Sequence, residues 1–315
     1  ENAALASIDG ARVEKRAGDA SSLEHTLDCG LNAAVLVRAN AQLLLVSSEI
    51  AAAPLGAGGA FALGGTLRMQ NGVVRAAGSN SFALAAASGG SVSARESNLS
   101  TQGASSPALY AAASGSVAVT GGMTATGGEH SPVISAAGSV TVSGATLRAN
   151  SAEAVAVDGG SVSLTDCAVS GRMGDVVVAN ARVIPYCVAL YRGAGGERSS
   201  FSMIRGALTA LRGDLFYATN TDASIYLEGV ALSFGEGRAL LRAAGNDGSR
   251  GWGEAGKNGA ACVLTAKDQT LRGDVVADAL SSVSLTLRGS SAYTGTVNAA
   301  NTARAARVTL EDGAT

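Results

Sequence analysis

A repeated tripeptide constrains the fold of this chain more than any other feature. Gly-Ser-Val occurs four times, and successive copies are 25, 23 and 22 residues apart. The second residue after each valine is also small or apolar, which is the alternation of a strand with one buried face. A period of about 20 to 50 residues is typical of solenoid proteins. The four copies begin at Gly90, Gly115, Gly138 and Gly160.

Less exact copies of the repeat continue at a similar spacing on both sides of these four. They appear upstream at residues 42–45 and 66–69, and the wide step between 224 and 261 predicts an inserted loop at 245–259. A further strand is expected at 201–204. The downstream copies are residues 182–183, 224–227, 261–264, 282–285 and 307–310.

Shorter apolar segments precede and follow each of these anchors. They are separated by Gly, Ser, Asn and Asp, the residues that form tight corners. Two or three short strands per turn are the layout of a parallel β-helix. We therefore predict an all-β chain with about a dozen coils. It would form a single domain over residues 1–315, with a less regular start or cap at 1–40.

The composition agrees with a thin solenoid core. The chain has 42 glycines and only 4% aromatic residues, so small side chains must fill the interior. Left-handed hexapeptide helices need an apolar residue every six positions, and calcium-binding repeats need a glycine-rich nonapeptide; neither occurs. The density of Gly and Ser also argues against a helical solenoid.

Charge and cysteine spacing argue against several partners. The net charge is −2 and no Lys/Arg-rich run is present, so we expect no nucleic-acid partner. No apolar stretch reaches about 18 residues, so we expect no transmembrane helix. The cysteines form no CxxC pair, and we expect no metal and no cofactor. Cys167 and Cys187 lie about one coil apart; buried thiols are favoured there over a disulfide.

Four stretches resemble secreted bacterial β-helix proteins that are described as adhesin-like. The resemblance covers most of residues 60 to 315, and it implies an exported or surface protein with a right-handed, pectate-lyase-like solenoid. The family has no established activity, so the resemblance implies no catalytic residue. The matching stretches are residues 215–230, 250–259, 269–275 and 290–301.

Many β-helices cleave polysaccharides, so the catalytic motifs of such enzymes bear on the function of this chain. Asn220-Thr221-Asp222 spells a motif of polygalacturonase-like hydrolases, whose chemistry also requires a paired Asp-Asp and a Gly-His-Gly. Both are missing, and the histidines are His25 and His130 alone. We interpret Asn220 and Asp222 as corner residues and His130 as a solvated loop residue. His25, near Glu24 and Asp28, is interpreted as part of a surface pair.

A calcium-dependent lyase would need several carboxylates around one ion and an arginine base. Isolated Asp residues next to glycine are more often turn formers, so this interpretation is the weaker one. The candidate groups would be Asp166, Asp175, Asp214, Arg172 and Arg212.

Aromatic residues gather in one part of the chain and suggest a binding surface. Eight of the twelve lie between 186 and 252, and sugar rings stack on exposed aromatic faces. We expect the phenylalanines of this region, Phe201, Phe216 and Phe234, in the core. Trp252 in the inserted loop either meets a ligand or folds back on the coil. The predicted binding residues are Trp252, Tyr186, Tyr191, Tyr217, Tyr226 and Arg250.

The sequence thus favours a non-catalytic, adhesin-like protein, extracellular or at the cell surface. Its partner would be a glycan or a host or matrix surface protein. Two alternatives stay open: a lyase or hydrolase of an acidic polysaccharide, and a passive surface spacer. The coil at 307–310 lacks a polar cap, so the natural protein is expected to continue past Thr315.

Overall fold

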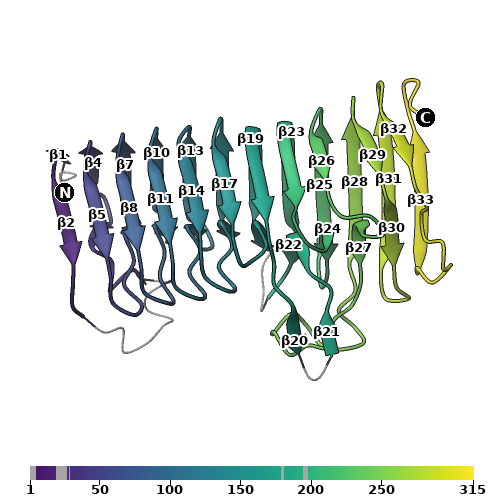
Figure 1. Cartoon of the computed structure of the whole chain (residues 1–315), viewed down its shortest axis with the longest axis horizontal. Coiled ribbons are helices and arrows are strands. Elements are labelled where there is room, and N and C mark those ends of the chain that lie inside the picture. Colours follow the sequence, from purple (N-terminus) through teal and green to yellow (C-terminus); the bar gives the residue numbers. More distant parts are fainter. Residues whose placement is uncertain (1–4, 19–26, 28, 179–180, 194–197) are drawn as a thin grey trace. The chain divides into compact units, whose positions relative to one another are not determined.

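A computed structural model describes residues 5–18, 27, 29–178, 181–193 and 198–315. Its strands form parallel sheets stacked as a β-solenoid of about 11 turns (Figure 1), which confirms the all-β parallel β-helix that the repeat predicts. The contacts divide the chain into two compact units, residues 1–154 and 155–315. Within the described residues, no helix has the length and apolar character needed to cross a membrane.

Each full coil of the first unit gives two strands to one sheet and one strand to a second sheet. The first sheet contains β1 (Leu5–Asp9), β2 (Arg12–Lys15), β4 (Gln42–Val46), β5 (Glu49–Ala52), β7 (Thr66–Gln70), β8 (Val73–Ala76), β10 (Ser91–Arg95), β11 (Asn98–Thr101), β13 (Ser116–Thr120), β14 (Met123–Thr126), β16 (Ser139–Ser143) and β17 (Thr146–Ala149). The second contains β3 (Val35–Arg38), β6 (Ala60–Leu63), β9 (Leu84–Ala87), β12 (Leu109–Ala111) and β15 (Ile134–Ala136).

The Gly-Ser-Val repeat corresponds to one coil. The valines Val92, Val117 and Val140 are register partners on β10, β13 and β16, and all three are buried. Parallel pairing places like residues on top of one another at a spacing of about 4.8 Å. A buried valine in one coil therefore extends the same apolar row in the next.

Serines at the corners explain part of the unusual composition. The hydroxyl of Ser106 accepts a hydrogen bond from the Ser81 amide, and the hydroxyl of Ser131 accepts one from the Ser106 amide. Successive corners are thereby linked through buried hydroxyls. Gly103 is needed beside them, because a Cβ atom there would lie 2.2 Å from the carbonyl oxygen of Gly78.

The second unit continues this pattern with longer strands. One sheet contains β19 (Ser161–Gly171), β23 (Ser199–Ala210), β25 (Asp222–Glu228), β26 (Ala231–Ser233), β28 (Ala261–Lys267), β31 (Ser282–Arg288) and β33 (Ala305–Leu310). The other contains β18 (Val155–Asp158), β22 (Tyr186–Tyr191), β24 (Asp214–Ala218), β27 (Ala239–Ala243) and β30 (Asp274–Ala277). Two small pairs complete it, β20 (Val176–Val178) with β21 (Ala181–Val183) and β29 (Thr270–Arg272) with β32 (Ala292–Thr294).

One predicted coil strand is wrong. Residues 182–183 belong to β21, which pairs antiparallel with β20 in a hairpin that projects from the coils (Figure 1). The coil instead passes from β19 to β23, where Val162 is the register partner of Phe201. Because β20 and β21 pair with each other, residues 182–183 form a strand that does not belong to the coil. The predicted strand at 201–204 is confirmed within β23.

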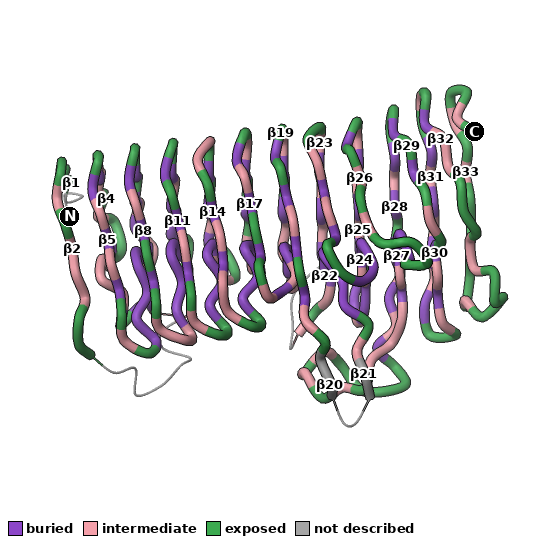
Figure 2. The backbone as a smooth tube through the Cα atoms, in the orientation of Figure 1, coloured by how far each residue is buried: buried purple, intermediate pink, exposed green. Residues whose placement is uncertain are grey.

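Buried residues recur along the strands of each unit (Figure 2). In the second unit, Phe201 and Phe216 are fully buried and meet edge to face with ring centroids 5.6 Å apart, which confirms the prediction for both. Phe234 is only partly buried, so its placement in the core is wrong: it follows the end of β26. Cys167 and Cys187 are buried thiols, as the sequence favours.

Candidate functional site

A pocket of about 280 Å³ lies in the second unit, between strands of the smaller sheet and the inserted loop 245–259. Aromatic rings and two arginines dominate its walls, and we call it the aromatic pocket. Strands β22, β24 and β27 and the segment before β22 supply Val183, Ile184, Tyr186, Asp214, Tyr217 and Arg242, and the chain from Ala244 onward supplies Gly245, Asn246, Asp247, Arg250 and Trp252.

Strand alternation brings Tyr217 and Arg242 to the outer face of the sheet. Their neighbours Phe216 and Leu241 are register partners and are buried in the coil. Tyr217 and Arg242, one position further along, therefore point the opposite way. The ring of Tyr186 stacks on Tyr217, with centroids 5.0 Å apart and planes 18° apart.

The loop folds back onto this face. Trp252 stacks on Tyr191, the last residue of β22, with ring centroids 4.1 Å apart. The guanidinium carbon of Arg250 lies 5.0 Å from the centroid of the Trp252 ring, within cation–π range. Nη1 of Arg250 donates a hydrogen bond of 2.9 Å to the hydroxyl of Tyr186. Arg250 thus joins the loop tryptophan to the strand tyrosine.

Two asparagines hold the loop in shape. The side chain of Asn258 is fully buried; its Nδ2 donates to the carbonyl oxygens of Asn246 and Trp252, both at 3.0 Å. Its Oδ1 accepts from the amide of Asn246 at 3.1 Å. Asn246 in turn donates to the hydroxyl of Thr219 at 2.8 Å, which ties the loop to the coil. A fully satisfied buried network of this kind fixes the loop before any ligand arrives.

The two arginines of the pocket differ in their partners. Asp214 is 2% exposed, and its Oδ2 accepts a 2.7 Å bond from Nε of Arg242. Arg250 has no ion pair of this kind among the described residues, and its Nη2 atom is buried without a hydrogen-bond partner. Burial raises the pKa of Tyr217 above its ordinary value.

Of the six predicted binding residues, the structure brings five together. Tyr186, Tyr217, Trp252 and Arg250 line the pocket, and Tyr191 supports Trp252 from behind. Asn246 and Asn258 are not among the predicted binding residues, although Asn246 lies in the insertion around Trp252. Their only sequence signal is that each lies near one end of the glycine-rich insertion.

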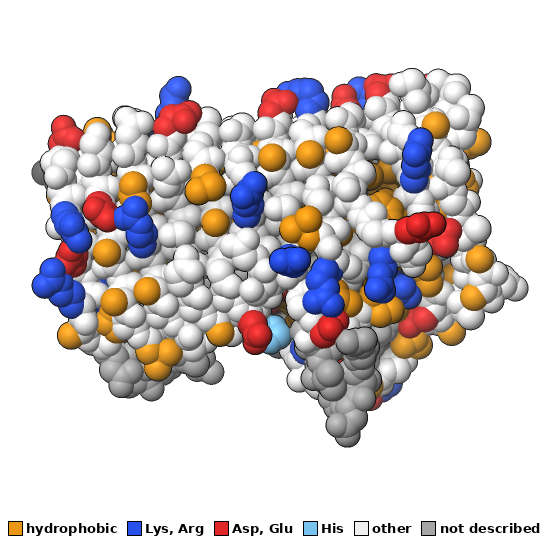
Figure 3. All heavy atoms as spheres, in the orientation of Figure 1, with side chains coloured by type: hydrophobic (Ala, Val, Ile, Leu, Met, Phe, Trp, Pro, Cys, Tyr) orange, Lys and Arg blue, Asp and Glu red, His pale blue; other side chains and the backbone are white. Residues whose placement is uncertain are grey.

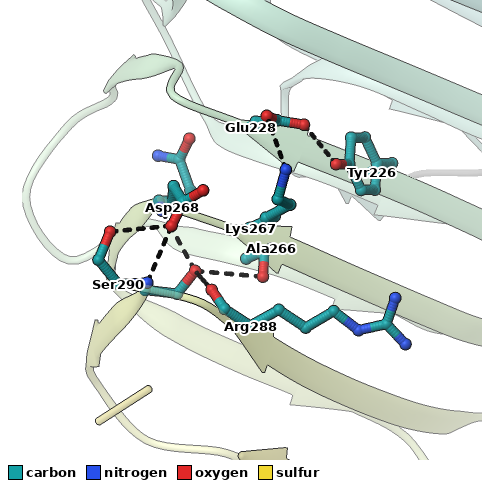
Figure 4. Close-up of polar contacts among 9 residues, drawn as sticks. Tyr226, Glu228, Ala266, Lys267, Asp268, Arg288 and Ser290 are labelled. Carbon is teal, nitrogen blue, oxygen red and sulfur yellow. Dashed lines mark hydrogen bonds and ion pairs between the residues drawn. The ribbon is translucent and has the colours of Figure 1, made fainter. Parts of the chain in front are cut away.

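Tyr226 lies apart from the other five. It is on β25 in the larger sheet, and its hydroxyl donates to Glu228, which also accepts a 3.2 Å bond from Nζ of Lys267 (Figure 4). The hydrogen bond to Glu228 raises the pKa of Tyr226 and lowers that of Glu228. Proximity in sequence therefore did not bring Tyr226 to the pocket, because the coil turns between β24 and β25.

The carboxylates considered for a calcium site do not converge. Asp166 makes a bidentate ion pair with Arg205, with distances of 2.7 and 2.8 Å. Asp175 pairs with Arg212 at 3.0 Å, and Asp214 pairs with Arg242. Each carboxylate thus bonds a different arginine. Among the residues that the structure describes, no three His, Cys, Asp or Glu side chains are grouped to hold a metal ion.

The motif at 220–222 covers the corner before β25, so the interpretation as a corner residue is confirmed for Asn220 and wrong for Asp222, which is the first residue of that strand. Asn220 has a φ of 50°, and its Nδ2 donates to the carbonyl oxygen of Arg192 at 2.7 Å. Asp222 lies 3.8 Å from the guanidinium of Arg198. His130, with a φ of 53°, is an exposed corner residue, and His25 lies outside the described residues.

A scan against models of protein families, a search of curated proteins and a search of solved structures each gave no match. The fold and the pocket define the chain as a parallel β-solenoid that carries a preformed aromatic pocket.

Proposed function

We propose that the second unit binds a carbohydrate in the aromatic pocket. The observation that carries this proposal is the convergence of Tyr186, Tyr217, Trp252 and Arg250 from strands and a loop. Sugar rings have apolar faces and hydroxyl edges, so they fit aromatic walls that carry a few placed polar groups. A volume of about 280 Å³ is near the lower end of ligand pockets, which suits a short segment of an extended glycan.

The polar groups of the pocket support this choice. The indole of Trp252 stacks on Tyr191 and contacts the guanidinium of Arg250. The buried Nη2 atom of Arg250 has no hydrogen-bond acceptor among the described residues. A hydroxyl of the ligand, or a water molecule, would supply this acceptor after a small shift of the side chain. Because Asn258 fixes the loop, little ordering entropy opposes binding.

The carboxylates beside the pocket favour binding over cleavage. Glycoside hydrolysis needs one carboxyl group that keeps its proton at working pH and one that is ionised. Asp214 is bonded to Arg242 and to the amide of Ala239. Hydrogen bonds from Ser249 lower the pKa of Asp247, which makes that carboxyl group a poor proton donor, and both oxygens of Asp214 are already engaged by these two bonds.

The wider role that we propose is that of an adhesin-like protein, extracellular or at the cell surface. A solenoid presents a long surface, and the pocket would give that surface its selectivity. A host or matrix protein as partner is the other outcome that a binding screen would reveal.

Trp252 makes the proposal directly testable, because it is the only tryptophan of the chain. An immobilised glycan panel identifies candidate sugars, and titration of each hit into the protein should change the tryptophan emission. Trp252→Ala should weaken binding of the same sugars roughly tenfold or more, because buried aromatic anchors carry most binding energy. Tyr226→Ala, on the other sheet, is the matched control and should bind as the wild type does. Sugar binding that Trp252→Ala leaves intact would refute the assignment to this pocket.

A further inference from the structure

A second pocket of the second unit shares the inserted loop. Its volume is about 320 Å³, and its basic lining residues are Arg192, Arg198, Lys257 and Arg304. Asp222 is the acidic residue among its described lining residues. We call it the cationic pocket.

The two pockets are close neighbours along the loop. Trp252 lines the aromatic pocket, and Lys257, five residues further on, lines the cationic pocket. Asn220 of the cationic pocket lies against Gly253, where an added Cβ atom would be 2.4 Å from its Oδ1. Trp252, in the wall of the aromatic pocket, is therefore adjacent in the loop to Gly253, which contacts the cationic pocket.

Two of the basic residues of this pocket, Arg198 and Lys257, make only exposed ion pairs among the described residues. Arg198 and Asp222 are 3.8 Å apart, and both side chains are about two-thirds exposed. Lys257 pairs with Glu254 at 3.0 Å, again between exposed side chains. Exposed pairs of this kind contribute little and exchange readily with another anion. Over the face in Figure 3, by contrast, positive and negative side chains are interspersed.

Guanidinium and ammonium groups of this kind bind oxyanions. A guanidinium presents parallel N–H donors that match the oxygens of a carboxylate or a sulfate, and an ammonium adds a point charge. The lining residues Arg198, Asn220, Lys257 and Arg304 are polar, and none of them has an aromatic ring on which a sugar could stack. A charged substituent therefore fits this pocket better than a sugar ring does.

We propose that the cationic pocket holds a carboxylate or sulfate substituent of the same glycan chain that stacks in the aromatic pocket. The ligand class is then an acidic polysaccharide. This inference rests on the proposed function, because it takes the aromatic pocket as the site of the sugar ring. The shared loop places both subsites within one extended chain.

The test uses dextran oligosaccharides of matched length in neutral, carboxymethylated and sulfated forms. Binding is followed by calorimetry and by Trp252 emission in low salt. At least one charged form should bind roughly tenfold more tightly than neutral dextran, and added salt should reduce that advantage. The preferred charged form identifies the oxyanion.

Variants separate the two pockets. The double variant Lys257→Gln/Arg304→Gln should reduce the affinity of the charged forms to that of neutral dextran. Arg307→Gln, an exposed arginine three residues from Arg304, is the control and should change nothing. Trp252→Ala should weaken the charged forms as well.

Each contrary outcome has its own meaning. Equal affinity for neutral and charged dextran, with no effect of the double variant, would overturn this inference and leave the proposed function standing. Charged dextran that binds independently of Trp252 would show two unrelated sites and overturn the shared ligand. Absence of binding by all three forms would overturn this inference, and the glycan panel would then decide the proposed function separately.

Discussion

Trp252 stacks on Tyr191 although 61 residues separate them in the chain, with ring centroids 4.1 Å and planes 24° apart. The contact joins the inserted loop to the end of β22. It answers the question that the sequence leaves open about Trp252: the ring folds back on the coil and also lines a pocket. A loop residue held in this way is supported by the coil and still lines the pocket.

Removal of that support should loosen the tryptophan. Tyr191→Ala takes away a stacked aromatic partner, which contributes about 0.5–1.5 kcal/mol beyond the buried area. We expect the emission of Trp252 to shift to longer wavelength and its quenching by acrylamide to increase, because the indole becomes more solvated. Tyr226→Ala should leave both unchanged. An emission spectrum of Tyr191→Ala that matches the wild type would contradict the stacked arrangement.

Loss of Asn258 should release the whole loop. Asn258→Ala removes the acceptor of the Asn246 amide and the donor to the Asn246 carbonyl oxygen, and an unsatisfied buried polar group costs about 1–3 kcal/mol. We expect faster proteolysis within 245–259 and weaker binding at both pockets, with the coils intact by circular dichroism. Asn150→Ala, at an exposed site, is the control. Unchanged cleavage kinetics would show that the network does not hold the loop.

The sequence predicts the coils well because stacked coils repeat the same residue pattern at a regular spacing. Val92, Val117 and Val140 share one row, so a short motif repeated three times determines a register. Excursions from the coil have no such redundancy. The segment at 182–183 has strand-like spelling, and only its partner in β20 reveals that it pairs outside the solenoid.

The candidate site shows the same division. Composition places the aromatic residues in one region, yet it does not say on which sheet each one lies. Tyr217 and Tyr226 are nine residues apart, and the corner between their strands sends them to different sheets. The role of Asn258 cannot be predicted from composition, because it depends on hydrogen bonds that form only in the folded loop. The right-handed sense of the coils stays a prediction from the period and the resemblance.

Two phenylalanines offer a test of where the core ends. Phe201→Ala should cost about 3–5 kcal/mol in the free energy of unfolding, because it leaves a cavity between β23 and the ring of Phe216. Phe234→Ala should cost much less, since that ring is partly solvated after β26. Urea unfolding of the two variants measures the difference. Equal losses would place Phe234 in the core after all.

Acid should weaken the last coils of the second unit. Oδ1 of Asp268 accepts bonds from the amide and the hydroxyl of Ser290 (Figure 4), and Oδ1 of Asp274 accepts the same pair from Thr296. The backbone hydrogen bonds, followed by the side-chain ones, lower the pKa of both carboxyl groups below the ordinary value of about 3.9. A lowered pKa in the folded state means that the unfolded chain takes up protons first as the pH falls.

The contribution of these two carboxylates to stability is therefore complete above the ordinary pKa and disappears as the pH falls through the lowered values. Asp268→Asn and Asp274→Asn should lower the unfolding free energy at pH 7, and this deficit should shrink progressively as the pH falls below the ordinary pKa of an Asp carboxyl group. Asp312→Asn, in the exposed last turn, serves as the control. Urea unfolding at several pH values measures the deficit. A deficit that stays constant with pH would mean that these bonds stabilise the coils without any dependence on the charge of the carboxylates.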